Sequence, residues 1–233
     1  GDASGSTSTE ENPSFTYDAP GDYTVSLSAT GTGGAAEVSM NINVQPNNFE
    51  LYYIDNDNLK VRKLDLNNPS SPVDVFDLPG FSFGLAYDES NEEFYYADDD
   101  AQTVWRQDLD GSNQTSISTG LSGPRDIALD IANSYAYVTE RSADRITRID
   151  LTDNSTINFY SNTDDANFLL PVGLDIHDGN LYATAVDFDA ETVWRGSIPD
   201  IALDQIIDFS AGGFGYGISV DKVNDKLYFD NND

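Results

Sequence analysis

The chain has 233 residues, of which 41 are aspartate or glutamate and 11 are lysine or arginine, so its formal net charge is −30. Such a field repels nucleic acid and anionic membranes, so we expect neither as a partner. The absence of cysteine excludes thiol catalysis and disulfides, and no apolar run is long enough to insert into a membrane. Hydrophobic residues still make up 39%, which predicts a folded chain.

The first 45 residues predict short strands of a β-sandwich. Alternating polar and apolar residues predict strands over 14–17, 23–29 and 37–44, with Gly- and Pro-containing turns between the later ones. The order Asn12–Tyr17 and then Pro20–Val25 resembles the C-terminal part of a PKD domain, an immunoglobulin-like sandwich of extracellular proteins. The resemblance implies that the N-terminal part of this domain lies upstream of residue 1. Residues 46–49 are predicted to be a linker.

From residue 50 to 233 the sequence is a repeat. A tyrosine opens each copy, at positions 52, 95, 137, 182 and 228, so the copies are 43, 42, 45 and 46 residues apart. A second strand-like run follows each of the first four copies, and a third run follows a Gly/Pro-rich turn. A period in the low forties that holds four short strands is typical of β-propeller blades. We therefore expect an all-β chain with about four propeller repeats and the start of a fifth.

The order of strands within a repeat follows from this assignment. We expect the Gly-Leu-Ala-Tyr-Asp type of run (84–88) to be innermost, the Tyr-Tyr type second and the Val-Trp-Arg type third. The stretch from Val104 to Asp130 resembles the YWTD-type, or lipoprotein-receptor class B, propeller repeat, and Tyr137-Val138-Thr139 resembles a prokaryotic surface-protein repeat of the YVTN kind. These families close with more blades, so we expect a piece of a longer secreted, prokaryotic polypeptide whose open strand edges allow self-assembly. The alternative is a small closed ring of four blades.

The loops between second and third strands are acidic in every repeat, and the topology places them on one face. Crowded carboxylates suit Ca²⁺. The candidate ligands are Asp55, Asp57, Asp98, Asp99, Asp100, Asp187, Asp189 and Glu191. The other interpretation is that Asp and Asn fill tight turns and keep the surface soluble. Both remain open at the level of sequence, and no other cofactor is indicated.

Aromatic residues in the loops that enter the innermost strands are predicted to share this acidic face. They form a candidate binding face of Phe81, Phe83, Phe214 and Tyr216. Two sequons, at Asn113 and Asn154, lie in corresponding hairpins on the opposite face and are candidate glycosylation sites.

Catalytic signals are weak. The single histidine, His177, replaces an aspartate of the other repeats and is expected to cap a turn in the same way. The innermost strands are expected to present Leu85, Ile127, Leu174 and Ile218 to the channel, where propeller enzymes need polar clusters.

The sequence therefore favours a non-catalytic extracellular or cell-surface module that binds protein or polysaccharide in adhesion, matrix, surface-layer or filament architecture. The alternative is a Ca²⁺-dependent propeller enzyme of the lactonase or polysaccharide lyase type, with part of its active site in further blades.

Overall fold

A computed structural model describes residues 7–17, 19–44, 49–187, 190–199, 202–209 and 216–230. The chain divides into two compact units, one of residues 1–51 with 64–71 and one of residues 52–63 with 72–233. The described part contains no helix that is long and apolar enough to cross a membrane.

The first unit contains an antiparallel hairpin of β1 (Gly21–Gly31) and β2 (Gly34–Val44). Tyr23 faces Ile42 and Leu27 faces Val38 across the ladder, so one side of the hairpin is apolar while the other is rich in Ser, Thr and Asn. The expected strand over 14–17 is wrong. This segment has no strand pairing. Phe15 contacts Tyr17 instead, and the rings of Tyr17 and Tyr23 are 4.4 Å apart.

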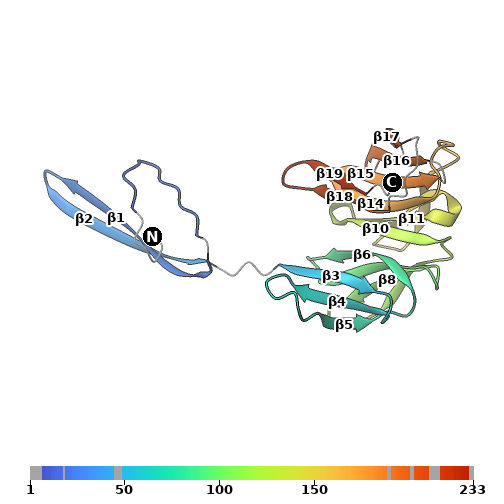
Figure 1. Ribbon diagram of the computed structural model, residues 1–233, viewed down its shortest axis with the longest axis horizontal. Helices are drawn as coiled ribbons and strands as arrows, with labels where there is room; N and C mark the ends of the chain where they lie inside the picture. The colour runs from blue at the N-terminus through green and yellow to red at the C-terminus, as the bar shows by residue number, and fades with distance from the viewer. Residues whose placement is uncertain are drawn as a thin grey trace. The chain divides into compact units, whose positions relative to one another are not determined.

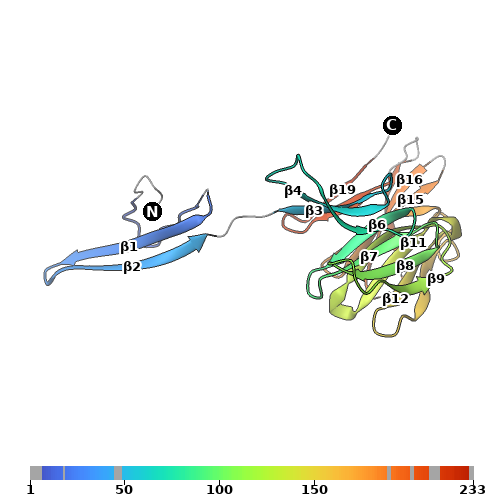
Figure 2. The ribbon, with the colours of Figure 1, turned by 90° about the horizontal axis from the view of Figure 1, so that it is seen from below.

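The repeats form successive antiparallel sheets (Figure 1). The first sheet has three strands, β3 (Glu50–Asp55), β4 (Lys60–Asp65) and β5 (Val73–Asp77). The second has β6 (Ser82–Asp88), β7 (Glu93–Asp98), β8 (Thr103–Asp108) and β9 (Thr115–Thr119), whose strands lie side by side in Figure 2. The third has β10 (Pro124–Asp130), β11 (Tyr135–Glu140), β12 (Arg145–Asp150) and β13 (Thr156–Ser161), with short 3₁₀ turns at Ile131–Asn133 and Arg141–Ala143.

The fourth sheet has β14 (Pro171–His177), β15 (Asn180–Asp187), β16 (Ala190–Ser197) and β17 (Asp204–Phe209), and the last has β18 (Ile218–Asp221) and β19 (Lys226–Phe229). The strand order within each sheet is the predicted one, and the inner strands β6, β10, β14 and β18 lie next to one another in that order. The prediction of an all-β chain with four-stranded propeller blades is confirmed.

The core lies between the blades. One apolar cluster joins the first and second sheets through Val61, Phe76 and Phe94, and another joins the second and third sheets through Tyr95, Ile127 and Ile149. A third, larger cluster joins the third and fourth sheets and holds Tyr137, Phe159, Phe168 and Trp194, all fully buried. The repeating tyrosine at 95 and 137 and the tryptophan at 194 therefore serve packing between blades, as their spacing indicates.

Candidate functional site

A β-bulge interrupts each complete inner strand at the same place. The ladder between β10 and β11 shifts between Pro124 and Ile127, and the β6–β7 and β14–β15 ladders shift at the corresponding residues. A bulge re-aims the side chains that it contains. The residues at this position are Phe83, Arg125 and Val172, and the sequence places Tyr216 at the equivalent point before β18.

These four equivalent residues line one cavity of about 500 Å³, together with Asp126 and Arg141. Since each inner strand contributes the same position, the cavity lies where the inner strands converge. Its rim is aromatic, because Phe83 is 42% and Tyr216 55% exposed. Ile127 and Leu174, expected to face a channel, are instead buried in the clusters between blades, and Leu85 packs against such a cluster. Ile218 is partly exposed and is not one of the cavity-lining residues. The expected set of channel-facing residues is therefore wrong, because the bulge turns the preceding residues inward in their place.

Threonines from the second strands hold the bulges in shape. The hydroxyl of Thr139 accepts a hydrogen bond from the Asp126 backbone N–H at 2.9 Å and donates to the Val172 carbonyl of the next blade at 2.9 Å. Thr184, at the equivalent position of β15, accepts from the backbone N–H of Gly173 at 2.9 Å. The third position of the tyrosine motif thus satisfies backbone groups that the bulge removes from the ladder.

Asp126 is the acidic group of the cavity. Its Oδ1 accepts a hydrogen bond from its neighbour's amide, Ile127 N–H, at 2.8 Å, and its Oδ2 accepts one from Leu174 N–H of the next blade at 2.8 Å. The residue is partly exposed and lines the cavity. Burial raises the pKa of Asp126 to about 6, since desolvation of the ionised form outweighs the two backbone hydrogen bonds that lower it.

This raised pKa predicts a pH dependence of stability. An unfolded aspartate has a pKa of about 3.9, so between about pH 4 and pH 6 the folded chain keeps a proton that the unfolded chain has released. The stabilising contribution of Asp126 is therefore full below pH 4 and is lost as pH rises through 6. Urea unfolding from pH 4 to 7 should show this decline, about 1 kcal/mol per pH unit at its steepest. The decline should disappear in Asp126→Asn, and parallel profiles for the two proteins would contradict the assignment.

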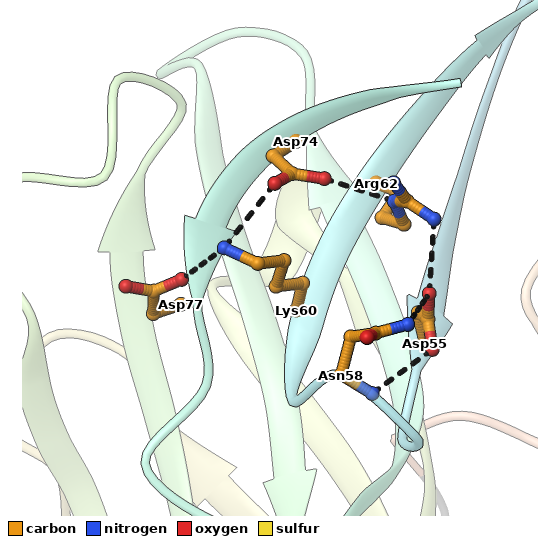
Figure 3. A network of polar contacts seen from close by, with 6 residues as sticks. All are labelled: Asp55, Asn58, Lys60, Arg62, Asp74 and Asp77. Carbon is orange, nitrogen blue, oxygen red and sulfur yellow. Dashed lines mark hydrogen bonds and ion pairs between the residues drawn. The ribbon is translucent and has the colours of Figure 1, made fainter. Parts of the chain in front are cut away.

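Among the candidate metal ligands, Asp55 belongs to an ion-pair network on the first sheet (Figure 3). Its Oδ2 lies 3.1 Å from Arg62 Nη1 and accepts from the side-chain amide of Asn58 at 2.9 Å. Hydrogen bonds from Asn58, together with Arg62, lower the pKa of Asp55. Arg62 also contacts Asp74, which in turn contacts Lys60 at 3.2 Å. Asp55 therefore links the second strand to the third rather than pointing to open solvent.

Asp98 occupies the same motif position in the next blade and has the same role. It is fully buried, and its carboxylate accepts from the indole N–H of Trp105 on β8 at 3.1 Å and from the Ala101 backbone N–H at 2.9 Å. In the third blade Glu140 takes this position and bonds Thr147, the residue equivalent to Trp105. The motif's acidic residue thus ties each second strand to its third strand in three successive blades.

The remaining candidates are dispersed. Asp99 lies 3.7 Å from Arg125, and Asp100 accepts from the backbone N–H of Phe81 at 2.9 Å, while Asp57 is exposed and Glu191 is fully buried. The side chain of Asp187 and the whole of Asp189 lie outside the described residues. Within the described ranges no three carboxylate or histidine side chains come together in a way that could hold a metal ion. A calcium site remains a prediction that depends on Asp187 and Asp189.

The candidate binding-face aromatics meet at the cavity. The rings of Phe81 and Phe83 are 5.1 Å apart, and Phe83 and Tyr216 both line the cavity, while Phe214 lies outside the described residues. The Phe81 carbonyl accepts from Asp99 N–H at 2.9 Å, so the acidic loop after β7 and the loop entering β6 do share one face. Asn113 and Asn154 are exposed in the β8–β9 and β12–β13 hairpins, both with left-handed backbone, and glycosylation there remains a prediction.

His177 does not cap its own turn. Asp88, Asp130 and Asp221 accept hydrogen bonds from backbone N–H groups of the four-residue loops that follow them. The loop after His177 is only Asp178-Gly179, both left-handed, and the imidazole Nε2 pairs with Asp225 of the next sheet at 2.9 Å. The capping prediction is wrong because the shorter hairpin has a different geometry.

The functional residues that sequence reasoning missed are Arg125, Asp126 and Arg141. One signal was available. Three of the four inner strands carry an uncharged residue followed by glycine at this position, and only β10, in the third sheet, carries Arg125-Asp126. A charged pair that interrupts an otherwise uncharged repeat position indicates a function specific to that blade.

The sequence matches no known family profile. The structure is similar to a chain in the crystal structure of a nidogen/laminin complex, with a TM-score of 0.68 and 21% identity over 78% of this chain and 69% of that one. It is also similar to catalytically inactive virginiamycin B lyase from Staphylococcus aureus, solved with quinupristin, with a TM-score of 0.61 and 12% identity over 90% and 82% of the two chains. A protein of unknown function from Bacteroides thetaiotaomicron gives a TM-score of 0.59 and 18% identity over 77% and 56%. At these identities the likeness establishes the propeller fold alone.

Proposed function

We propose that this chain is a non-catalytic recognition module of the cell surface or extracellular space, and that it binds a protein or polysaccharide through the face that carries the cavity. The observation that carries the proposal is the exposed aromatic rim of Phe81, Phe83 and Tyr216 around a concave site. Exposed aromatic side chains gathered at a hollow are typical of binding surfaces, since they bury large areas with little loss of conformational freedom. The similarity to a propeller from a nidogen/laminin complex supports a protein partner.

The first unit supports the same location. The hairpin β1–β2 exposes Leu27, Val38 and Met40 on its apolar side. A second sheet packed on that side would make the sandwich that the PKD resemblance implies. A surface protein would then have the sandwich as a spacer and the propeller as its binding domain. Calcium at the acidic loops and self-assembly through strand edges belong to this proposal.

A second candidate is a propeller enzyme of the lyase or lactonase type. The observation that favours it is Asp126, because a carboxyl group with a pKa near 6 in a cavity is suited to general acid–base work near neutral pH. Both of its oxygens already accept backbone hydrogen bonds, and the one from Leu174 joins two blades, which favours a structural role. The similarity to virginiamycin B lyase also supports the enzyme candidate.

The test is a binding screen of the recombinant chain against extracellular matrix proteins and surface polysaccharides, with turnover assays on the same polysaccharides and on lactones. We expect saturable binding that falls about tenfold or more in Phe83→Ala and Tyr216→Ala, because truncating an aromatic contact at a binding centre costs 1–2 kcal/mol or more. Tyr228→Ala is the matched control, since Tyr228 is equally exposed, at 57%, but does not line the cavity. Turnover by the unmodified chain that is lost in Asp126→Asn would contradict the non-catalytic module and support the enzyme.

A further inference from the structure

The cavity concentrates positive charge in a strongly acidic chain. Only 11 residues of the 233 are lysine or arginine, yet two of the six that line the cavity are Arg125 and Arg141. They come from different elements, Arg125 from the bulge of β10 and Arg141 from the turn after β11. Surface solubility does not explain this placement, because arginine that serves solubility extends into solvent and both of these are partly buried.

Arg141 has an unsatisfied donor. Its Nε is buried without a hydrogen-bond acceptor, and in the described parts of the chain its guanidinium forms no ion pair. Its backbone N–H donates to the Gly123 carbonyl at 2.9 Å, so the residue is anchored while its side chain remains available. A buried donor without an acceptor is destabilising, and a ligand oxygen at this position would satisfy it.

Arg125 is oriented by an aromatic ring. Its guanidinium carbon lies 3.9 Å from the centroid of the Phe83 ring, and its nearest carboxylate oxygen, of Asp99, is 3.7 Å away, beyond hydrogen-bond distance. A guanidinium that stacks by its face keeps its N–H groups, which lie in its plane, for an acceptor at its edge. Burial lowers the pKa of Arg125, and the positive charge of Arg141 lowers it further, so the two cations are near enough to repel each other.

The charge balance selects the kind of anion. Two cations, Arg125 and Arg141, and one carboxyl group, that of Asp126, line the cavity, while Asp99, 3.7 Å from Arg125, offsets part of the charge on Arg125. About one positive charge or less is left for a ligand, which suits a monoanion better than a phosphate dianion. The net charge of −30 on the chain further disfavours polyanions.

We infer that this cavity binds the carboxylate group of a small monoanionic ligand between Arg125 and Arg141, with the ring or apolar body of the ligand against Phe83, Tyr216 and Val172. Planar guanidinium groups match carboxylates with two parallel hydrogen bonds, and the aromatic walls match a flat or cyclic body. The inference deepens the proposed binding function and rests on it for biological meaning, but the binding of a carboxylate is measurable by itself.

The experiment is calorimetric titration of the recombinant chain with two carboxylate probes, benzoate and D-glucuronate, which distinguish an aromatic acid from a sugar acid. Benzamide and D-glucose are the uncharged counterparts, and inorganic phosphate is the competing anion. We expect saturable binding of one carboxylate with a dissociation constant below about 1 mM. Arg125→Gln and Arg141→Gln should each weaken it about tenfold or more, because each removes charge-assisted hydrogen bonds.

The matched control is Arg106→Gln, which changes the net charge equally but lies on β8, away from the cavity. It should bind the carboxylate as the unmodified chain does. Absence of saturable binding, equal binding of benzamide or D-glucose, or tighter binding of phosphate would each overturn the inference. If a variant does not fold, the comparison of charged and uncharged probes on the unmodified chain still tests whether the chain binds a carboxylate. If protein or polysaccharide binding persists but no carboxylate binds, the carboxylate inference is overturned and the proposed binding function is kept.

Discussion

Replacing Glu140 with alanine is expected to lower the free energy of unfolding by about 3 kcal/mol, which corresponds to roughly 6 to 12 °C in melting temperature for a propeller of this size. Glu140 is fully buried at the end of β11. Its carboxylate accepts from Arg145 Nε at 2.7 Å and Nη2 at 2.8 Å, from the hydroxyl of Thr147, and from the backbone N–H of Ser122 at 2.7 Å. Removal leaves these donors without their acceptor in a space that water fills poorly.

Thermal and urea unfolding would measure this loss. Glu89→Ala is the matched control, because Glu89 is exposed in a loop and should change stability by less than about 0.5 kcal/mol. Glu140→Gln should fall between the two, since its amide oxygen still accepts while its NH₂ group faces donors. A melt of Glu140→Ala that overlays that of Glu89→Ala would show that the network has no structural role.

Gly84→Ala is expected to destabilise the propeller by about 2 to 3 kcal/mol through overpacking of its inner strands. A Cβ at Gly84 would lie 2.6 Å from Asp126 Cα and 2.7 Å from the backbone N of Ile127, both on the neighbouring inner strand. Backbone atoms cannot rotate away as a side chain can, so the two blades must separate. Because Arg125 and Asp126 lie on that strand, the same substitution should also disturb the cavity.

The control for this prediction is provided by the repeat itself. Gly217 holds the equivalent position before β18, and among the described residues a Cβ there would meet Asp230 Oδ1 alone, at 3.5 Å, an ordinary contact. Gly217→Ala should therefore leave the melting temperature nearly unchanged. Equal melting temperatures for the two alanine variants would contradict the close approach of β6 and β10.

Much of the fold was predictable because a propeller is a local structure repeated. The tyrosine period gave the number and order of strands, since each blade pairs neighbours in sequence through short hairpins. The prediction failed at residues 14–17 and at His177, where one aromatic cluster and one hairpin length decided the outcome. Residues 14–17 do alternate and His177 does align with the aspartates of the other repeats. Their contacts, with Tyr23 and with Asp225, could not be read from those local patterns.

The candidate site was less predictable because its contacts join different blades. The aromatic rim could be placed on one face from topology, and the structure brings Phe83 and Tyr216 to the same cavity. The acidic residues Asp55 and Asp98 were indistinguishable in sequence from metal ligands, yet Arg62 and Trp105 engage their carboxylates. Which side chain pairs with a given carboxylate depends on the register between neighbouring strands. A shift of that register by one residue would change every pair.

The sequence by itself determined the all-β class, the period, the strand order and the acidic surface, because these follow from residue type and spacing along a single chain. Only the tertiary structure showed that the bulge residues Phe83, Arg125 and Val172 line one cavity together with Tyr216, and that Asp126 reaches Leu174, 48 residues away, with a pKa of about 6. The physical reason is that burial, desolvation and hydrogen-bond partners are set by the distance between neighbouring blades, which no spacing within one repeat encodes.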